Sequence, residues 1–499
     1  MEKEQENKLH TTDNVPRQMT GAELKSMLKS SIQFKSLGGM RCEELTLPAE
    51  DKRWWTDCKI GLFVHWGIYS VQGHGEWAKF NEQIPDGEYE KLADELAAEA
   101  FHPGEWVALA KEFGARYMVM VTRHHDGFAL WDSPGSWGQF TSQAIGPHRD
   151  FVREYADACR EAGLHVGLYY STMDWRFPGY FDPQGQPKSA AQMKRQCYAQ
   201  VEELCSRYEP DILWYDGSWL AHDGSDASAA WFWEPVELNR LARRYRPKLL
   251  INPRSGWEGD FYCDEGSHEI RGGIVPVLWE KNMCICSGSS WGYMENDPVS
   301  DFDWLIRMMV NVVCRGGNWL VNIGPDKNGK VPEEIRARIR EVGEWLRTYG
   351  ESIYETQAGP YEPVDGVYGS TFRGDTVYLH ILDTKAFEKI VLPDPENEIL
   401  DAALIDGRPV EISGETNASC AKAAPGRGEA EAAAREPSGR AEENASCAKA
   451  ATDRAEKSAS GGVRLLLPSA MPGPDTIVVL KMKNAVRREA ADIRFTGKE

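Results

Sequence analysis

Asp216 is the residue of this 499-residue sequence whose setting most favours chemistry. It ends the apolar run DILWYDG, and the aromatic residues Trp214, Tyr215 and Trp219 surround it in the sequence. An isolated Asp-Gly pair commonly caps a turn. Here the run is typical of a buried strand, and the aromatic neighbours would remove water from one side of the carboxylate. These features favour a catalytic role for Asp216.

Histidines follow two other apolar runs. His124 and His125 come after RYMVMVTR, and His65 comes after KIGLFV, with Glu76 and Trp77 a little further on. Imidazole nitrogens can hydrogen-bond to sugar hydroxyls, and an indole can stack on the apolar face of a sugar ring. A metal site with His65 as third ligand is the alternative, but the sequence contains no HxH or HExxH pattern. We therefore expect no metal and no cofactor.

A second source of carboxyl groups is the acidic, loop-like stretch GDFYCDEGSHE, which contains Asp260, Asp264, Glu265 and Glu269. Cleavage of a glycoside commonly requires two carboxyl groups, one that attacks the anomeric carbon and one that protonates the leaving oxygen. For each of these four residues, a solvated acidic loop without catalytic function is the alternative.

The candidates stand at the ends of short apolar runs that alternate with helical patterns between about Leu47 and Ser352. The runs are rich in Val, Ile, Leu, Tyr and Trp, as strands buried on both faces are. Repeated strand–helix units predict an α/β fold with a (β/α)8-type barrel, whose active site lies at the carboxyl ends of the strands. A doubly wound open sheet is the alternative, but no GxGxxG follows a strand.

Changes in composition set the predicted domains. Residues 1–46 form a polar N-terminal extension, 47–354 the catalytic barrel, 355–484 an antiparallel β-sandwich, and 485–499 a C-terminal tail. The sandwich is interrupted at about 413–462 by a segment rich in Ala, Glu, Ser and Gly, in which NASCAKAA occurs twice. We expect neither the extension nor the insertion to contact the catalytic residues, although the insertion could cover the site or mediate assembly.

Charge and hydrophobicity exclude several classes of partner. The net charge of −20 disfavours binding to nucleic acid and to anionic membranes. No apolar run approaches the ~18 residues of a membrane span, and no secretory signal is visible, so we expect a cytoplasmic protein. The cysteines form no CxxC motif and suit free thiols in a reducing compartment. A homo-oligomer is compatible with the sequence.

Over about Leu47–Tyr354 the sequence resembles the α-L-fucosidases of glycoside hydrolase family 29. The resemblance rests, in order, on FVHWGIYSV followed by GEW, RYMVMVTRHHDGFALWDS, DILWYDG, SSWGY and RGGNWLVNIGP. It implies a retaining exo-α-L-fucosidase that hydrolyses terminal α-L-fucose from fucosylated oligosaccharides or glycoconjugates by double displacement, with Asp216 as nucleophile. It also implies a fucose pocket, to which we add Trp214 from the aromatic cluster; the predicted substrate contacts are His65, Glu76, Trp77, His124, His125, Tyr169, Trp214, Arg254 and Trp291.

The acid/base residue is less sharply indicated. DFYCDE approximates the family's acidic loop, which makes Glu265 the first choice, Glu269 the second and Glu280 the third. Glu280 ends the strand-like run PVLWE, where an ordering or hydroxyl-binding role is equally suitable. Two other functions are kept as alternatives: a metal-dependent barrel hydrolase that uses His65, His124 and His125, and a sugar-binding protein without turnover.

Overall fold

The computed structural model describes residues 31–96, 101–221, 225–288, 290–393, 397–415, 462–469, 471 and 473–486. The chain divides into two compact units, one that runs to Gln357 and one that begins at Ala358. Most of the repeated insertion and nearly all of the C-terminal tail lie outside the described residues. None of the described helices is long and apolar enough to cross a membrane.

The first unit is built on a nine-stranded sheet in the order β1-β7-β8-β9-β2-β3-β4-β5-β6. Strands β2 to β6 pair in parallel in chain order, and so do β7 to β9. Because β9 also pairs in parallel with β2, the sheet curls into the barrel-like fold that the sequence predicts. The strands are β2 (Ile60–Val64), β3 (Tyr117–Arg123), β4 (His165–Ser171), β5 (Ile212–Asp216), β6 (Leu250–Ile251), β7 (Tyr262–Asp264), β8 (Trp279–Cys284) and β9 (Gly317–Ile323).

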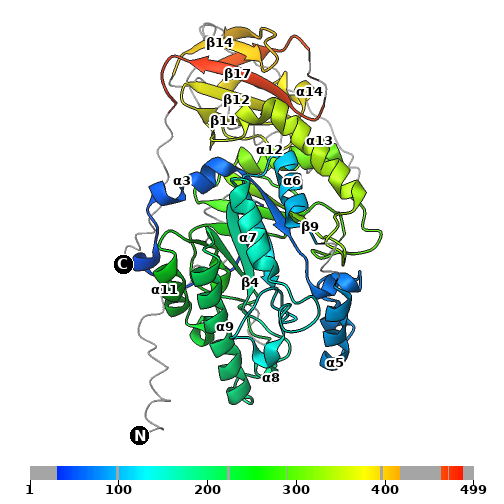
Figure 1. Ribbon diagram of the computed structural model, residues 1–499. Coiled ribbons are helices and arrows are strands. Elements are labelled where there is room, and N and C mark those ends of the chain that lie inside the picture. Colours follow the sequence, from blue (N-terminus) through cyan, green and yellow to red (C-terminus); the bar gives the residue numbers. More distant parts are fainter. Residues whose placement is uncertain are drawn as a thin grey trace, which may run out of the picture. The chain divides into compact units, whose positions relative to one another are not determined.

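Helices follow most of these strands (Figure 1). Helix α6 packs against α7 and α13, and α9 packs against α11. The exceptions are β6 and β7: of the described residues, only the short turn η8 (Pro253–Ser255) lies between them, and no helix separates β7 from β8. The longer helices are α6 (Pro103–Phe113), α7 (Phe151–Glu161), α9 (Pro187–Arg207), α11 (Pro235–Tyr245), α12 (Phe302–Val313) and α13 (Glu333–Tyr349).

Helix α7 illustrates why these segments fold as predicted. The Asp150 carboxylate accepts a hydrogen bond from the backbone N–H of Arg153 at 2.9 Å and so caps the amino end. Phe151, Val152, Tyr155, Ala156 and Cys159 recur at helical spacing and are buried against the barrel. Burial of this one face, rather than intrinsic helix propensity, stabilises the helix.

One part of the predicted barrel is different in the structure. No ladder joins β6 and β7 in the described sheet. Asp260 bridges this seam instead: its backbone N–H donates to the Ile251 carbonyl, and its Oδ2 accepts from the Ile251 N–H, both at 2.8 Å. Arg243 pairs with the same carboxylate at 2.6 Å. Asp260 therefore has a structural task, and the stretch expected to be a loop contains strand β7.

The second unit consists of antiparallel sheets, as the sequence predicts. A five-stranded sheet has the order β10-β11-β12-β17-β14, and a three-stranded sheet has the order β13-β16-β15. The strands are β10 (Gln357–Ala358), β11 (Tyr368–Arg373), β12 (Thr376–Ile381), β13 (Leu392–Pro393), β14 (Ile399–Leu404), β15 (Glu411–Glu415), β16 (Gly462–Leu466) and β17 (Thr476–Met482). Glu415 pairs with Gly462, so the intervening residues leave and re-enter the sheet at adjacent positions.

Candidate active site

The candidate side chains gather at the carboxyl ends of the barrel strands. Asp216 is the last residue of β5, and Tyr169 lies near the end of β4. His65, the pair His124–His125, Arg254 and Glu265 follow β2, β3, β6 and β7. Because parallel strands end at the same rim of a barrel, residues far apart in the sequence meet there. The structure therefore brings the candidate residues together at one rim.

Three donors hold the carboxylate of Asp216. Oδ2 accepts from the Tyr169 hydroxyl at 2.7 Å, and Oδ1 accepts from the Gly217 N–H at 2.7 Å. Arg254 forms an ion pair with Oδ1 at 2.5 Å. Gly217 has a φ of +67°, and a Cβ there would lie 2.9 Å from the His125 ring, so this position requires glycine. The carboxylate is thus fixed in one orientation, while part of its surface stays accessible.

Arg254 joins three carboxyl groups. Besides Asp216, it contacts Asp226 through Nε at 3.0 Å and Glu265 through a terminal nitrogen. The guanidinium is buried, but the three acidic partners together raise the pKa of Arg254 well above its usual value. Arg254 therefore stays charged, and its guanidinium holds the carboxyl groups of Asp216 and Glu265 close to each other.

The setting of Glu265 raises its pKa. Burial is the main cause, and the negative charge of Asp216 acts in the same direction, while Arg254 opposes both. Asn282 lies 3.5 Å from its Oε1. A carboxyl group that is pushed toward its protonated form beside an accessible carboxylate can serve as a proton donor.

The other acidic candidates have different surroundings. Glu269 is exposed and pairs with Arg271 at 2.8 Å, and among the described residues no interaction joins it to Asp216. Asp264 is buried and pairs with Lys281 at 3.4 Å. Glu280 is fully buried, where Tyr117 and Trp214 donate to it at 2.6 and 3.1 Å. Of the three acid/base choices, only Glu265 forms an ion pair with Arg254, the residue that also pairs with Asp216.

Burial favours the neutral form of the three histidines His65, His124 and His125. Burial lowers the pKa of His65 to about 4 and the pKa values of His124 and His125 well below the usual range. His65 Nδ1 lies 2.7 Å from the Asn322 Oδ1, which orients the ring and leaves Nε2 as an acceptor. The buried Nδ1 of His124 has no hydrogen-bond partner among the described residues. The rings of His65 and His124 therefore each have a nitrogen that could hydrogen-bond to a substrate hydroxyl.

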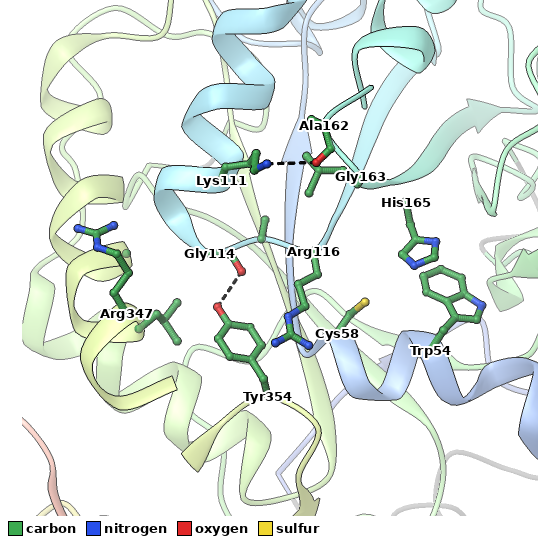
Figure 2. Close-up of a pocket in the computed structure, with 14 residues that line it drawn as sticks. Trp54, Cys58, Lys111, Gly114, Arg116, Ala162, Gly163, His165, Arg347 and Tyr354 are labelled. Atoms are coloured by element: carbon green, nitrogen blue, oxygen red, sulfur yellow. Dashed lines mark hydrogen bonds between the residues drawn. The ribbon is translucent and has the colours of Figure 1, made fainter. Parts of the chain in front are cut away.

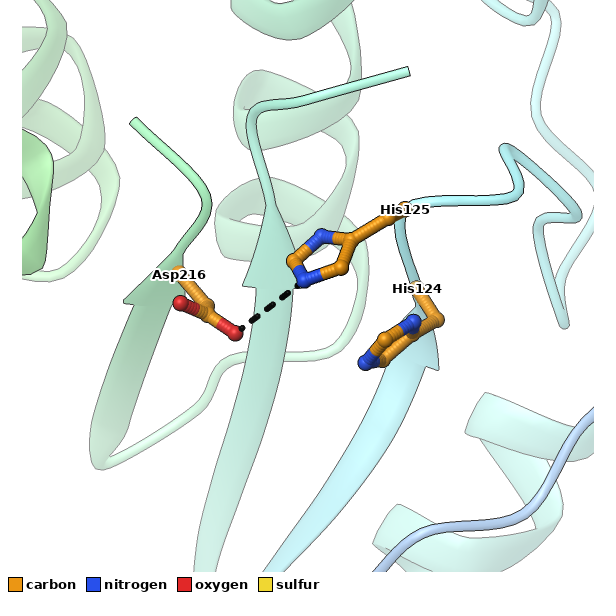
Figure 3. A group of neighbouring side chains, drawn as sticks. All are labelled: His124, His125 and Asp216. Carbon is orange, nitrogen blue, oxygen red and sulfur yellow. Dashed lines mark ion pairs between the residues drawn. The ribbon is translucent and has the colours of Figure 1, made fainter. Parts of the chain in front are cut away.

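The same cluster also bears on metal binding. His124, His125 and Asp216 offer ligand atoms within 4.8 Å of one another, and Figure 3 shows the imidazoles of His124 and His125 near Asp216. However, the Arg254 guanidinium already lies 2.5 Å from Asp216, and Tyr169 donates to the other oxygen. A cation at this place would have to displace a fixed positive charge, so the donor set does not suit a metal.

One carboxylate oxygen of Glu76 is used within the protein, while its predicted contact with substrate stays a prediction. Its Oε2 accepts from the Ser290 hydroxyl at 2.9 Å and from the N–H groups of Trp291 and Gly292 at 2.9 and 2.8 Å. This oxygen is therefore committed to the loop that carries Trp291. The ring of Trp291 in turn lies 5.4 Å from the His65 ring, so Glu76 orients one wall of the pocket.

Aromatic side chains continue outward from the site. The Trp77 ring lies 5.2 Å from His125 and 5.0 Å from Trp175, and Trp175 lies 5.2 Å from Phe80. Phe80 is 44% exposed although it belongs to this cluster. Trp214 faces inward instead, stacked on Tyr169 at 5.9 Å and bonded to Glu280.

Several residues of the site escaped the sequence analysis. Asn322 had a usable signal, because it is an amide inside the buried run WLVNIGP. Asp226, which contacts Arg254, lies in a polar stretch without any periodic pattern. Ser36, whose hydroxyl contacts Asp226, lies in the N-terminal extension. The extension therefore reaches Arg254 indirectly, through Asp226, which the sequence analysis did not name.

A hollow of the first unit lies at the opposite end of the barrel strands (Figure 2). Arg116 precedes β3 and His165 begins β4, so these lining residues mark the amino ends. The Arg116 guanidinium stacks on Tyr354 at 4.1 Å and pairs with Glu355 at 3.0 Å, and His165 stacks on Trp54 at 3.9 Å. None of the predicted catalytic residues lines this hollow.

The chain is similar to known α-L-fucosidases in sequence. A model of the α-L-fucosidase family matches residues 41–351. The chain is 31% identical over 396 residues to the plasma α-L-fucosidase of Rattus norvegicus, which covers 73% of this chain and 81% of that protein. It is 33% identical over 337 residues to the tissue α-L-fucosidase of the same species, with 61% and 70% covered.

Solved structures agree with this similarity. The α-L-fucosidase isoenzyme 1 from Paenibacillus thiaminolyticus aligns with a TM-score of 0.68 at 29% identity, over 87% of this chain and 99% of that chain. A family 29 α-L-fucosidase from Bacteroides thetaiotaomicron, solved as a trapped covalent intermediate with 2-fluoro-fucosyl fluoride, has a TM-score of 0.70 at 23% identity, over 91% and 100%. The second likeness concerns the fold.

Proposed function

This chain belongs to the α-L-fucosidase family of glycoside hydrolases, and from that membership we propose that it releases terminal α-L-fucose with retention, with Asp216 as nucleophile and Glu265 as acid and base. One observation carries the proposal: a single buried arginine, Arg254, contacts both carboxyl groups at the carboxyl rim of the barrel. Retaining enzymes need their two carboxyl groups only ~5–5.5 Å apart, and a shared guanidinium imposes a short separation.

In the first step, Asp216 attacks the anomeric carbon and forms a covalent bond to it. The bond from that carbon to the leaving oxygen breaks, and Glu265 gives its proton to that oxygen. In the second step, water attacks the same carbon while Glu265 takes a proton from the water. The bond to Asp216 then breaks, which releases fucose and restores both carboxyl groups.

The charges of the site support this change of role. In the free protein, burial and the negative charge of Asp216 raise the pKa of Glu265, which favours the acid form needed first. Once Asp216 is esterified its charge is gone, while Arg254 remains beside Glu265. The pKa of Glu265 then falls, which favours the base form needed second.

We propose that the neutral histidines and the aromatic walls recognise fucose. Nε2 of His65 would accept a hydrogen bond from one ring hydroxyl, and Nδ1 of His124 would bond to another. Trp77 and Trp291 would face apolar parts of the sugar. A buried site that pairs with each hydroxyl discriminates strongly against epimers, because mismatched groups are left without partners. The natural substrates would be fucosylated oligosaccharides or glycoconjugates, whose remaining part could contact the exposed ring of Phe80.

Trapping of the intermediate tests the nucleophile. We expect 2-fluoro-fucosyl fluoride to inactivate the protein, and peptide mass analysis to find the added fluorofucosyl group on Asp216. A label on another carboxylate would overturn the assignment. Failure to label or to cleave any aryl fucoside would instead favour a sugar-binding protein without turnover.

Leaving-group dependence tests the acid. Glu265→Ala should slow hydrolysis of natural fucosides by ~10²-fold or more, because their leaving groups need a proton. It should spare the first step with a dinitrophenyl fucoside. Azide should then raise the rate by attacking the fucosyl-enzyme from the face that the leaving group has vacated, which gives α-fucosyl azide. Glu269→Ala, at the exposed site, is the matched control and should act as wild type. Equal loss on good and poor leaving groups, without an azide effect, would remove Glu265 from this role.

A further inference from the structure

Residues 31–40, here called the N-terminal strap, cross the barrel seam between β6 and β7. Within the strap, β1 (Phe34–Lys35) pairs antiparallel with β7. At its far end, the Met40 N–H donates to the Gly256 carbonyl at 2.8 Å, and the Met40 carbonyl accepts from the Glu258 N–H at 3.0 Å. One end of the strap therefore lies on β7, just before Glu265, and the other on the turn that follows β6 and Arg254.

The strap lies close against the barrel. A Cβ on Gly39 would come within 2.7 Å of the Trp257 carbonyl carbon, closer than side-chain atoms approach backbone. On the other side of the seam, the Gln33 N–H donates to the Ser267 hydroxyl at 3.1 Å. Contacts on both sides define the position of the residues between them.

Ser36 stands in the middle of the strap and contacts Asp226. Its hydroxyl donates to Asp226 Oδ2, and the Trp219 N–H donates to Oδ1 at 3.0 Å. Asp226 is buried, and its Oδ2 also accepts from Arg254 Nε at 3.0 Å. The two terminal nitrogens of Arg254 hold Asp216 and Glu265. A continuous series of polar contacts thus leads from the strap to both carboxyl groups.

We propose that Ser36 and Asp226 are positioning residues, which hold Arg254 so that Asp216 and Glu265 keep the separation that double displacement requires. The N-terminal strap thereby completes the active site without touching the substrate. This inference rests on the proposed function, because it concerns the same two carboxyl groups.

The surroundings of Asp226 give the proposal a signature in pH. Burial raises its pKa, the negative charge of Asp216 adds to this, and Arg254 and the Ser36 hydroxyl oppose it. The negative charge of Asp226 also acts on Tyr180, whose pKa is raised mainly by burial. Without the Ser36 hydroxyl, Asp226 should take up a proton at a higher pH. The protonated carboxyl group would no longer form an ion pair with Arg254. The acidic limb of kcat/KM should then move to higher pH.

The test replaces Ser36 in the full-length protein and measures hydrolysis of an aryl fucoside. Ser36 has a φ of +58°, a conformation that glycine adopts freely and asparagine tolerates. Ser36→Gly removes the hydroxyl without backbone strain and should lower kcat/KM roughly tenfold, as expected for loss of a hydrogen bond to a charged group. Ser36→Asn, whose amide can donate to Asp226, should restore part of the rate and the original acidic limb.

Two further variants separate positioning from folding. Gly39→Ala should push the strap off Trp257 and reproduce the defect of Ser36→Gly, although it alters neither polar residue. Gln33→Ala, an exposed side chain of the same strap, should act as wild type. Fluorofucosyl labelling should still reach Asp216 in Ser36→Gly, only more slowly, whereas a different labelled residue in the wild type would refute the proposed function itself. If both Ser36→Gly and Gly39→Ala keep the wild-type kcat/KM and pH profile, the strap has no positioning role.

Discussion

At the scale of single residues, Glu280 shows how burial decides what a carboxyl group can do. It is as acidic by type as Glu265, but it is fully buried beneath the site among Tyr117, Trp214 and other core residues. Burial raises its pKa from 4.5 to about 7. A group that cannot meet solvent or substrate cannot transfer protons to a leaving oxygen, so we assign Glu280 to the ordering of the barrel interior.

The raised pKa of Glu280 predicts a pH-dependent stability. Glu280 binds a proton more tightly in the folded protein than in the unfolded chain. The free energy of unfolding should therefore fall by about 3 kcal/mol as the pH rises from about 4.5 to about 7. Glu280→Gln should match the wild type at pH 5 and exceed its stability at pH 8, measured by urea unfolding. Glu269→Gln, an exposed control, should leave the free energy of unfolding unchanged at both pH 5 and pH 8. A constant difference at both pH values would contradict the assignment.

Also at the residue scale, the position of Arg254 predicts that chelators spare activity. The guanidinium occupies the place beside Asp216 that a cation would need. Aryl-fucoside hydrolysis should therefore be unchanged after dialysis against EDTA, and metal analysis of the active protein should find no stoichiometric ion. Loss of activity on chelation that zinc reverses would instead support the metal-dependent hydrolase.

At the scale of elements, the seam between β6 and β7 is the irregular part of the barrel. Asp260 replaces a strand partner there and is itself held by Arg243. Asp260→Ala would leave Arg243 buried without its carboxylate, and breaking such a pair costs about 3–5 kcal/mol. We expect a loss of that size in urea unfolding. Glu341→Ala, which breaks the exposed pair with Arg338, should cost less than about 1 kcal/mol. Similar values for the two variants would show that Asp260 does not close the seam.

At the scale of the whole molecule, the chain combines a barrel unit with a unit of antiparallel sheets and has the fold of family 29 α-L-fucosidases. The cysteines of the described part are free thiols. This agrees with the sequence analysis, but the cytoplasmic location stays a prediction. The net charge of −20 concerns partners rather than the fold.

The insertion can be tested at this same scale. Because Glu415 and Gly462 are direct partners in the antiparallel pair β15–β16, a short turn can join them. Replacing residues 416–461 by Asn-Gly, a pair that favours tight hairpins, should preserve folding and kcat/KM on aryl fucosides. Thermal unfolding and kinetics check this. An insoluble or inactive product would show that the insertion has a structural or catalytic task.

By itself, the sequence determined the barrel, the antiparallel sheets and the rim where catalysis would occur. Strand runs, helical periodicity and strand-end residues are local patterns, and they placed Asp216, His65 and His124 at this rim before any contact was known. Glu265 was chosen from the family resemblance instead. Only the tertiary structure decided which carboxyl groups share Arg254, that Glu280 is sealed in the core, and that Ser36 reaches Asp226. The physical reason is that such contacts join residues far apart along the chain, and their geometry depends on how the strands close around the seam rather than on any local pattern.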